Sequence, residues 1–145
     1  MKHFKDTVLQ LHGEKVWHRI QEQMVSDDYK DSNCAGLAAY LLGLQDNSEY
    51  IDPADFMKEY SFAGGSLVAV SDIKGNIAGD TDIADICVFG SPEYPGHIAL
   101  FLGLMDRTVY TFDQISGGNV GFSEYTAYNN FKRLDFPRGF YNLSN

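Results

Sequence analysis

With 145 residues, the chain is long enough to bury one hydrophobic core and short for two, so we expect a single domain over residues 1–145. Hydrophobic residues make up 44% and aromatic residues 14% of the sequence, which excludes disorder as the default. The formal net charge of −9 argues against nucleic acid or an anionic membrane as a partner, because such binding depends on clustered lysine and arginine.

No stretch approaches the roughly 18 apolar residues that a membrane-spanning helix needs. The first residues, M-K-H-F-K-D-T-V-L-Q, also lack the apolar run of a signal peptide. We therefore expect a protein that is made in the cytoplasm without a signal peptide. If it acts in the periplasm or cell wall, a phage lysis or specialised secretion route must deliver it.

The first third of the sequence predicts helices. Four apolar residues recur at the spacing of one helix face: Val16, Trp17, Ile20 and Met24. Turn formers at 26–33 then precede C-A-G-L-A-A-Y-L-L-G-L, which predicts a second helix that starts at or near Cys34. A third, shorter helix is predicted within 51–60, with Asp52 as its cap and Pro53 at its first position.

From about residue 66 the pattern changes to short β-type runs separated by Gly, Pro, Asp and Asn. These runs lie at 66–70, 85–90, 97–104, 108–115 and 131–136. Because the helices come first and the strands later, we expect an α+β fold in which N-terminal helices pack on a C-terminal antiparallel sheet. The aromatic residues of the strand region are expected in the core, namely Tyr110, Phe112, Phe131 and Phe136.

Cys34 is the candidate nucleophile. A thiol attacks as its thiolate, which both a helix N-terminus and a neighbouring imidazole stabilise. The preceding D-S-N offers capping side chains, and Ala35 and Gly36 are small enough to let a substrate approach the helix end. The second cysteine, Cys87, lies within the apolar run I-C-V-F and is expected in the core. Two cysteines form no disulfide framework, and no zinc-ligand spacing occurs, so we expect neither a metal nor a cofactor.

His97 is the candidate base. The other histidines, at positions 3, 12 and 18, precede the cysteine in the helical region, whereas His97 opens a strand after the turn S-P-E-Y-P-G. One strand later, Asp113 interrupts an apolar run, where an acid is costly to bury without a partner. The separation of 16 residues (113 − 97) allows an antiparallel hairpin that pairs the two residues, as a triad requires.

These segments resemble a known family. D-S-N-C-A-G-L-A-A-Y-L-L-G-L is similar to the cysteine motif of CHAP and NlpC/P60 peptidoglycan hydrolases, and A-D-I-C-V-F-G…P-G-H-I-A-L-F-L-G is similar to their histidine strand pair. T-F-D-Q-I-S-G-G resembles the CHAP segment that carries an acidic residue and a glutamine. The resemblance spans about residues 29–136 and implies a papain-like fold.

The resemblance implies that Cys34 is the nucleophile, His97 the general base and Asp113 the residue that orients it. It implies cleavage of amide bonds in peptidoglycan peptides, by a lysin-type module or an interbacterial amidase toxin, for which an immunity protein would be a partner. For the oxyanion and substrate, we expect contributions from Asn33, Tyr29 and Gln114. Some CHAP enzymes bind calcium through an acidic loop, but Asp27, Asp28 and Asp31 lack the regular spacing of such a loop.

Two positions depart from the family pattern: Ile115 replaces the usual asparagine, and Ala84 replaces a glycine. Two other functions therefore remain open. The chain could hydrolyse a non-wall protein or an acyl substrate, since papain-like folds host many chemistries. Alternatively, it could be a catalytically degenerate domain that binds a peptide or a partner protein, in which case Cys34 would have the reactivity of an ordinary thiol.

Overall fold

The structure is a computed structural model that describes residues 4–26, 28–60, 62–63, 84–90, 93–105, 108–114, 118–126, 137 and 139–143. Within this part of the chain the helices are α1 (Phe4–Leu11), α2 (Glu14–Val25), α3 (Cys34–Leu41) and α4 (Pro53–Glu59), with a short 3-10 helix η1 (Asp28–Asp31) before α3. The strands are β1 (Phe62–Ala63), β2 (Ile86–Gly90), β3 (Pro95–Met105), β4 (Thr108–Gln114), β5 (Val120–Thr126) and β6 (Gly139–Leu143).

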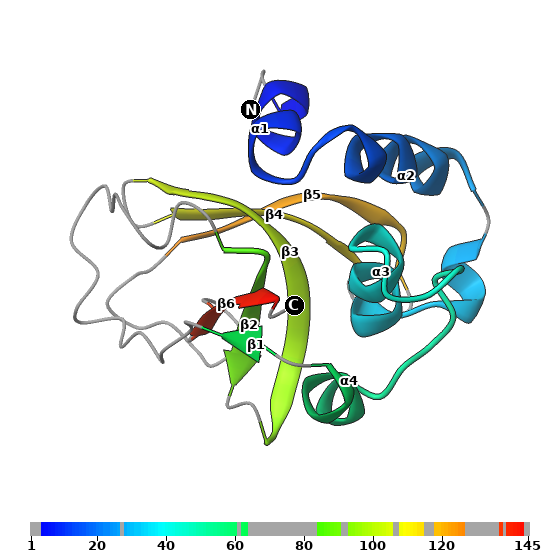
Figure 1. Cartoon of the computed structure of the whole chain (residues 1–145), viewed down its shortest axis with the longest axis vertical. Helices are drawn as coiled ribbons and strands as arrows, with labels where there is room; N and C mark the ends of the chain where they lie inside the picture. Colours follow the sequence, from blue (N-terminus) through cyan, green and yellow to red (C-terminus); the bar gives the residue numbers. More distant parts are fainter. Residues whose placement is uncertain are drawn as a thin grey trace.

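The strands form one sheet in the order β1-β6-β2-β3-β4-β5, and every neighbouring pair is antiparallel. Helices α1, α2 and α3 lie along the curved sheet, and α4 sits beside its lower end in the view of Figure 1. The predicted α+β fold, with N-terminal helices on an antiparallel sheet, is thereby confirmed. Among the described residues, no helix is both long and apolar enough to cross a membrane.

Alternation along β3 and β4 divides the core between the two faces of the sheet. Leu100 and Phe112 pack with Leu37 in the cluster between helices and sheet. Ala99 and Phe101 belong to the cluster on the opposite face. Side chains two residues apart on a strand share a face. His97 and Asp113 therefore lie on the same face as Ala99 and Phe101, and not on the face that the helices cover.

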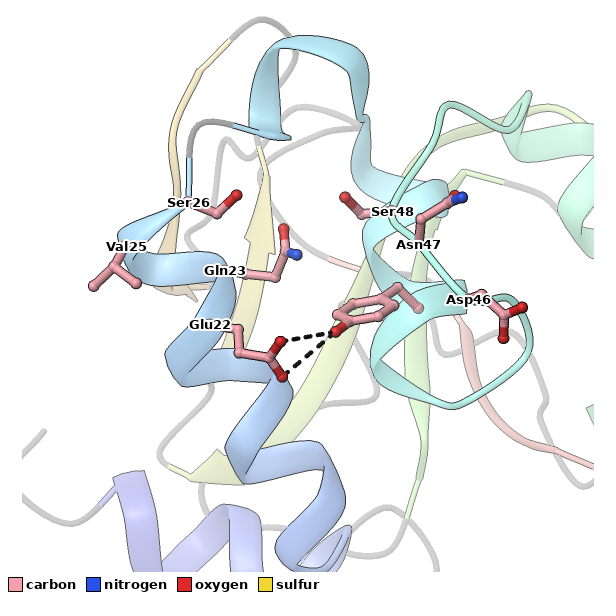
Figure 2. A pocket seen from close by; sticks show the side chains of 8 residues that line it. Glu22, Gln23, Val25, Ser26, Asp46, Asn47 and Ser48 are labelled. Atoms are coloured by element: carbon pink, nitrogen blue, oxygen red, sulfur yellow. Dashed lines mark hydrogen bonds between the residues drawn. The ribbon is translucent and has the colours of Figure 1, made fainter.

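The predicted helices largely match the structure. Asp52 caps α4 by accepting hydrogen bonds from the backbone N–H groups of residues 54 and 55, and Pro53 opens the helix. The prediction that Met24 lies on the packed face of the helix was wrong, because Met24 is 51% exposed whereas the neighbouring Gln23 is buried. The last turn of α2 lies beside the loop that carries Ser48 (Figure 2), and Gln23 is the residue of this turn that is buried there.

The predicted strands were less complete. The runs at 85–90, 97–104 and 108–115 correspond to β2, β3 and β4, although β3 begins earlier, at Pro95. The runs at 66–70 and 131–136, with Phe131 and Phe136, lie outside the described residues. Strands β5 and β6 were missed. In β5 the sequence V-G-F-S-E-Y-T places glycine and serine where a strand signal needs bulky apolar residues.

A buried histidine ties the helices to the sheet. The pairing of β3 with β4 shifts register between Phe101 and Gly103. The Nε2 of His12, after α1, donates a 2.7 Å hydrogen bond to the Phe101 carbonyl. Its side chain is 1% exposed and its Nδ1 lies 3.8 Å from Asp85, whose carboxylate accepts the backbone N–H of Leu143. Burial lowers the pKa of His12 against the opposing effects of Phe101 and Asp85, so the imidazole is neutral at pH 7.

We expect His12→Ala to lower the free energy of unfolding by about 2–4 kcal/mol, because it leaves the Phe101 carbonyl unpaired and opens a cavity. Since folding lowers the pKa of His12, the unfolded state binds the proton more readily, and native stability falls as pH drops below 6.5. The stability of His12→Ala should therefore lack this dependence on pH. Urea unfolding of both chains between about pH 5 and 8 measures both effects.

The control is His18→Ala, because His18 is exposed on α2. It should change the free energy of unfolding by no more than about 0.5 kcal/mol. Equal destabilisation by the two substitutions, or an unchanged pH slope in His12→Ala, would contradict the role assigned to His12.

Candidate active site

Helix α3 begins at Cys34 because Asn33 caps it. The Asn33 Oδ1 accepts the Gly36 N–H at 2.9 Å and the Ile51 N–H at 3.1 Å, and its Nδ2 donates to the Ile51 carbonyl at 2.7 Å. A primary amide presents a donor and an acceptor side by side, as a neighbouring strand does. Asn33 therefore fixes the start of the cysteine helix and joins it to the loop before α4.

We expect Asn33→Asp to lower the free energy of unfolding by about 1–3 kcal/mol. A carboxylate can still cap Gly36, but it has no hydrogen for the Ile51 carbonyl and repels that oxygen at close range. Urea unfolding at pH 7 measures the effect. The matched control is Asn47→Asp, because the Asn47 Oδ1 only accepts from the Glu49 N–H and a carboxylate keeps that bond. Comparable losses in the two variants would contradict the assigned role.

The reason for glycine at position 36 differs from the one expected. A Cβ on Gly36 would collide with the backbone carbonyls of Glu49 and Ser48. The small residue thus lets the 48–49 segment pack against the first turn of α3. We expected Gly36 to leave room for a substrate. This was wrong on the side where a Cβ would project, because the backbone of residues 48 and 49 occupies that space.

His97 and Asp113 share the face of the sheet opposite to α1 and α2. Leu100 pairs with Phe112, which puts Asp113 across from Ala99, two residues along β3 from His97. Such diagonal neighbours on one face come within reach of each other's side chains. Nε2 of His97 lies 2.8 Å from Oδ2 of Asp113 and donates to it, so the predicted hairpin and its residue pairing are confirmed.

The turn before His97 requires glycine. Gly90 ends β2 with φ +97°, and a Cβ there would lie 2.7 Å from the Tyr94 carbonyl oxygen. The ring of His97 then packs against Phe89, with 5.2 Å between ring centroids. This contact and the Asp113 hydrogen bond together set the orientation of the imidazole.

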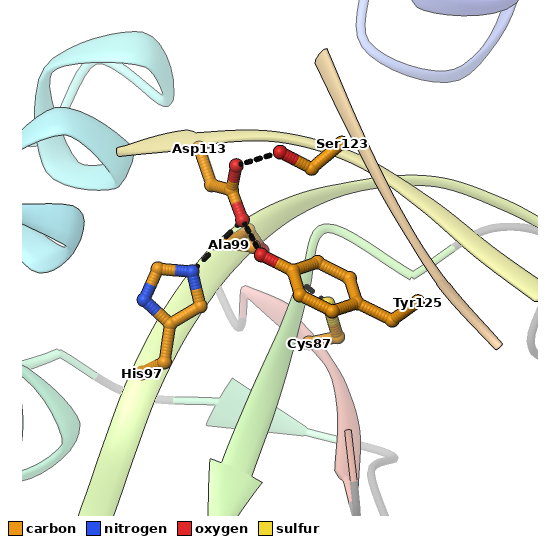
Figure 3. Close-up of polar contacts among 6 residues, drawn as sticks. All are labelled: Cys87, His97, Ala99, Asp113, Ser123 and Tyr125. Atoms are coloured by element: carbon orange, nitrogen blue, oxygen red, sulfur yellow. Dashed lines mark hydrogen bonds and ion pairs between the residues drawn. The ribbon is translucent and has the colours of Figure 1, made fainter. Parts of the chain in front are cut away.

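Cys34 lies at the other side of the imidazole. Its side chain lies near enough to His97 to raise the pKa of the imidazole, and the two residues come from α3 and β3. Because Nε2 is engaged by Asp113, the ring nitrogen that remains for the thiol is Nδ1, which points away from Asp113 in Figure 3. Cys34 is 9% exposed and is not in a disulfide.

The surroundings of His97 favour the imidazolium. Burial alone lowers its pKa, but hydrogen bonds with Asp113 and Cys34, together with the charges of both, raise the pKa to about 9. His97 is therefore protonated at neutral pH. A protonated imidazole beside a cysteine at a helix N-terminus is the arrangement that stabilises a thiolate.

Asp113 is held by three donors. It is 2% exposed, and besides His97 it accepts hydrogen bonds from the hydroxyls of Ser123, at 2.7 Å, and Tyr125, at 2.5 Å (Figure 3). Burial raises the pKa of Asp113, but these hydrogen bonds and the charge of His97 outweigh it and lower the pKa. Burial and the Asp113 charge raise the pKa of Tyr125, which keeps its proton and stays a donor.

Ser123 and Tyr125 were not predicted as members of the site. Both lie on β5, the strand that the sequence pattern failed to indicate. The signal that could have found them is their spacing of two residues, which places both hydroxyls on one face of a strand next to a buried acid. Without a predicted β5 there was no reason to set them beside Asp113.

The other predicted residues have the following places. Tyr29 lies in η1, five residues before Cys34, and its side chain lies outside the described part. Gln114 is fully buried, and its amide donates a 3.0 Å hydrogen bond to the Gly118 carbonyl. Ile115 lies outside the described residues. The oxyanion and substrate roles of Asn33, Tyr29 and Gln114 stay predictions.

Cys87 is fully buried in β2, as predicted, and burial raises the pKa of its thiol. Among the described residues, no three His, Cys, Asp or Glu side chains gather as a metal site would require. No family model, curated protein or solved structure matches the chain. The function must therefore be argued from the site itself.

Proposed function

We propose that this chain is a cysteine hydrolase that cleaves amide bonds in peptidoglycan peptides through Cys34, His97 and Asp113. One observation carries the proposal: a cysteine at the first position of a capped helix lies beside an imidazole that donates to a buried carboxylate. Each feature taken alone has a structural explanation. Together they meet the geometric requirements for a nucleophile, a base and a residue that orients the base.

In the proposed mechanism, the Cys34 thiolate attacks the carbonyl carbon of an amide, and the C–N bond breaks as the imidazolium of His97 gives its proton to the leaving amine. The product is an acyl-enzyme and a free amine. His97, now neutral, takes a proton from water, whose oxygen attacks the thioester carbon; the C–S bond breaks, which releases the acid and regenerates the Cys34 thiolate beside the His97 imidazolium. Asp113 keeps the imidazole oriented and stabilises its charge throughout.

The first turn of α3 supplies a donor for the oxyanion. Backbone N–H groups at a helix start have no carbonyl within the helix to bind. Asn33 accepts the N–H of Gly36, which leaves the Cys34 N–H as the donor beside the reacting sulfur. Such donors stabilise the negative oxygen that forms when the thiolate attacks.

The substrate class rests on the resemblance of the Cys34, His97 and Asp113 segments to CHAP and NlpC/P60 enzymes, with a papain-like fold as part of the proposal. Under it, the enzyme works on the periplasmic side or at the cell wall as a lysin-type module or an interbacterial effector. An effector would have an immunity protein as its inhibitor. Co-purification with the products of neighbouring genes tests for that partner.

The deciding experiment is mass spectrometry of purified peptidoglycan after incubation with the chain. New muropeptide fragments are expected, and their masses identify the bond. Walls from several bacterial types should be used, since stem and bridge peptides differ. If folded protein releases no fragments from any of them while Cys34 still reacts with iodoacetamide, the substrate assignment is wrong and a non-wall protein or acyl substrate is favoured.

A further inference from the structure

Tyr125 donates to the same oxygen of Asp113 that accepts the imidazole N–H of His97. The Tyr125 hydroxyl lies 2.5 Å from Oδ2, and Nε2 of His97 lies 2.8 Å from that atom (Figure 3). The hydroxyl of Ser123 donates instead to the other oxygen, Oδ1, at 2.7 Å. A carboxylate has about four lone-pair sites, two on each oxygen. Donors from β3 and β5 therefore share Oδ2 between them.

The ring of Tyr125 is held by the residue that also packs on the imidazole. Phe89 of β2 lies edge-on to Tyr125, with 4.7 Å between ring centroids, and 5.2 Å from the ring of His97. Tyr125 packs against the core cluster to which Phe89 belongs. Because the ring is packed in this way, its hydroxyl has little freedom to leave Asp113.

We propose that Tyr125 is a positioning residue that acts on His97 through the shared oxygen of Asp113. A second donor on Oδ2 draws negative charge away from the hydrogen bond with His97, so the carboxylate holds the imidazolium less tightly than it would without Tyr125. For cleavage, this role rests on the proposed hydrolase function. There, an imidazolium that is held less tightly gives its proton more readily to the leaving amine.

The other ionisable groups around the pair leave this role to Tyr125. Within the described part of the chain, Asp113 and Cys34 are the groups that raise the pKa of His97. Cys87 of β2 lies near enough to Asp113 to sense its charge, but burial raises the pKa of the Cys87 thiol, which stays neutral. Burial and the charge of Asp113 also raise the pKa of Tyr125, so the phenol remains a donor wherever His97 titrates.

The test is an NMR titration of the His97 imidazole in the full-length chain with labelled histidines, in which His97→Gln identifies the resonances. The native pKa is expected at about 9. Tyr125→Phe removes the hydroxyl and keeps the ring, so the pKa of His97 should rise by at least about half a pH unit. Ser123→Ala is the matched control. It should change the pKa less, because Ser123 donates to the other oxygen.

An unchanged or lowered pKa of His97 in Tyr125→Phe would overturn the inference, as would an equal rise in Ser123→Ala. Fluorotyrosine at position 125 supplies a second substitution, which also decides the question if Tyr125→Phe does not fold. It keeps the ring and the hydroxyl, but the fluorine makes the phenol a stronger donor. The pKa of His97 should therefore fall, and an unchanged or raised pKa would show that the hydrogen bond does not act on His97.

The titration needs no substrate, so its outcome is separate from that of the hydrolase proposal. If peptidoglycan is cleaved, Tyr125→Phe should move the alkaline limb of the pH profile to higher pH, whereas Asp113→Asn should move it to lower pH. A raised pKa in a Tyr125→Phe chain whose native form cleaves nothing would support the role of Tyr125 and refute only the hydrolase proposal. Cleavage with an unchanged pKa would refute only the role of Tyr125.

Discussion

Replacing Cys34 with alanine is expected to abolish cleavage, lowering kcat by about 10³-fold or more, because no other group can form the acyl-enzyme. The side chain occupies the first turn of α3 at the surface of the core, so the loss of one sulfur should lower the stability by only about 1 kcal/mol. The measurement is the peptidoglycan digest described above, performed with equal amounts of native and variant protein whose thermal unfolding has been compared.

Cys87→Ala is the matched control, since it removes the other thiol of the chain from a fully buried position. It should leave the fragment pattern unchanged when the rate is expressed per folded molecule. Iodoacetamide should likewise modify Cys34 and spare Cys87, because burial raises the pKa of the Cys87 thiol and shields it. Fragments that persist in Cys34→Ala would remove this residue from the mechanism.

The pH profile of cleavage should have an alkaline limb near pH 9, where His97 loses the proton that it gives to the leaving amine. Asp113→Asn removes the charge that helps to hold this proton. We expect the limb to move to lower pH by at least about one unit, and kcat/KM at pH 8 to fall by roughly tenfold or more. Rates of cleavage or of Cys34 alkylation between about pH 5 and 10 measure both effects.

The stability of the native state also depends on the protonation of His97. Because the pKa of His97 is raised above 6.5 on folding, its contribution to stability is complete below pH 6.5 and is lost as pH rises toward 9. Ser123→Ala is the control for Asp113→Asn. It removes one hydrogen bond from the same carboxylate but keeps the charge, so its alkaline limb should stay close to that of the native chain. A shift of equal size in both variants would show that packing, not charge, sets the pKa.

Much of the site could be predicted because its residues carry local signals. Cys34 follows turn formers and precedes an apolar helix, so its place at a helix start depends on neighbours within four residues. His97 and Asp113 lie on consecutive strands of one hairpin, where alternation decides which side chains share a face. A polar residue in an apolar strand demands a partner, and the hairpin limits where that partner can be.

The rest depended on contacts between segments that the sequence keeps apart. The hydrogen bonds of Asn33 with Ile51 span 18 residues, and the bond of His12 to Phe101 spans 89. Ser123 and Tyr125 reach Asp113 only because β5 pairs with β4, and β5 carries too little apolar signal to be predicted. The exposure of Met24 likewise depends on which loop the end of α2 meets.

The amino-acid sequence by itself determined that helices precede strands, that a helix starts at Cys34 after capping residues, and that a histidine and an acid lie on one hairpin, since each follows from local periodicity and turn chemistry. Only the tertiary structure decided that Cys34 lies beside His97, that two further hydroxyls donate to Asp113, and that Gly36 makes room for the backbone of residues 48 and 49. Those outcomes depend on packing between distant segments, whose geometry is the joint result of the whole core.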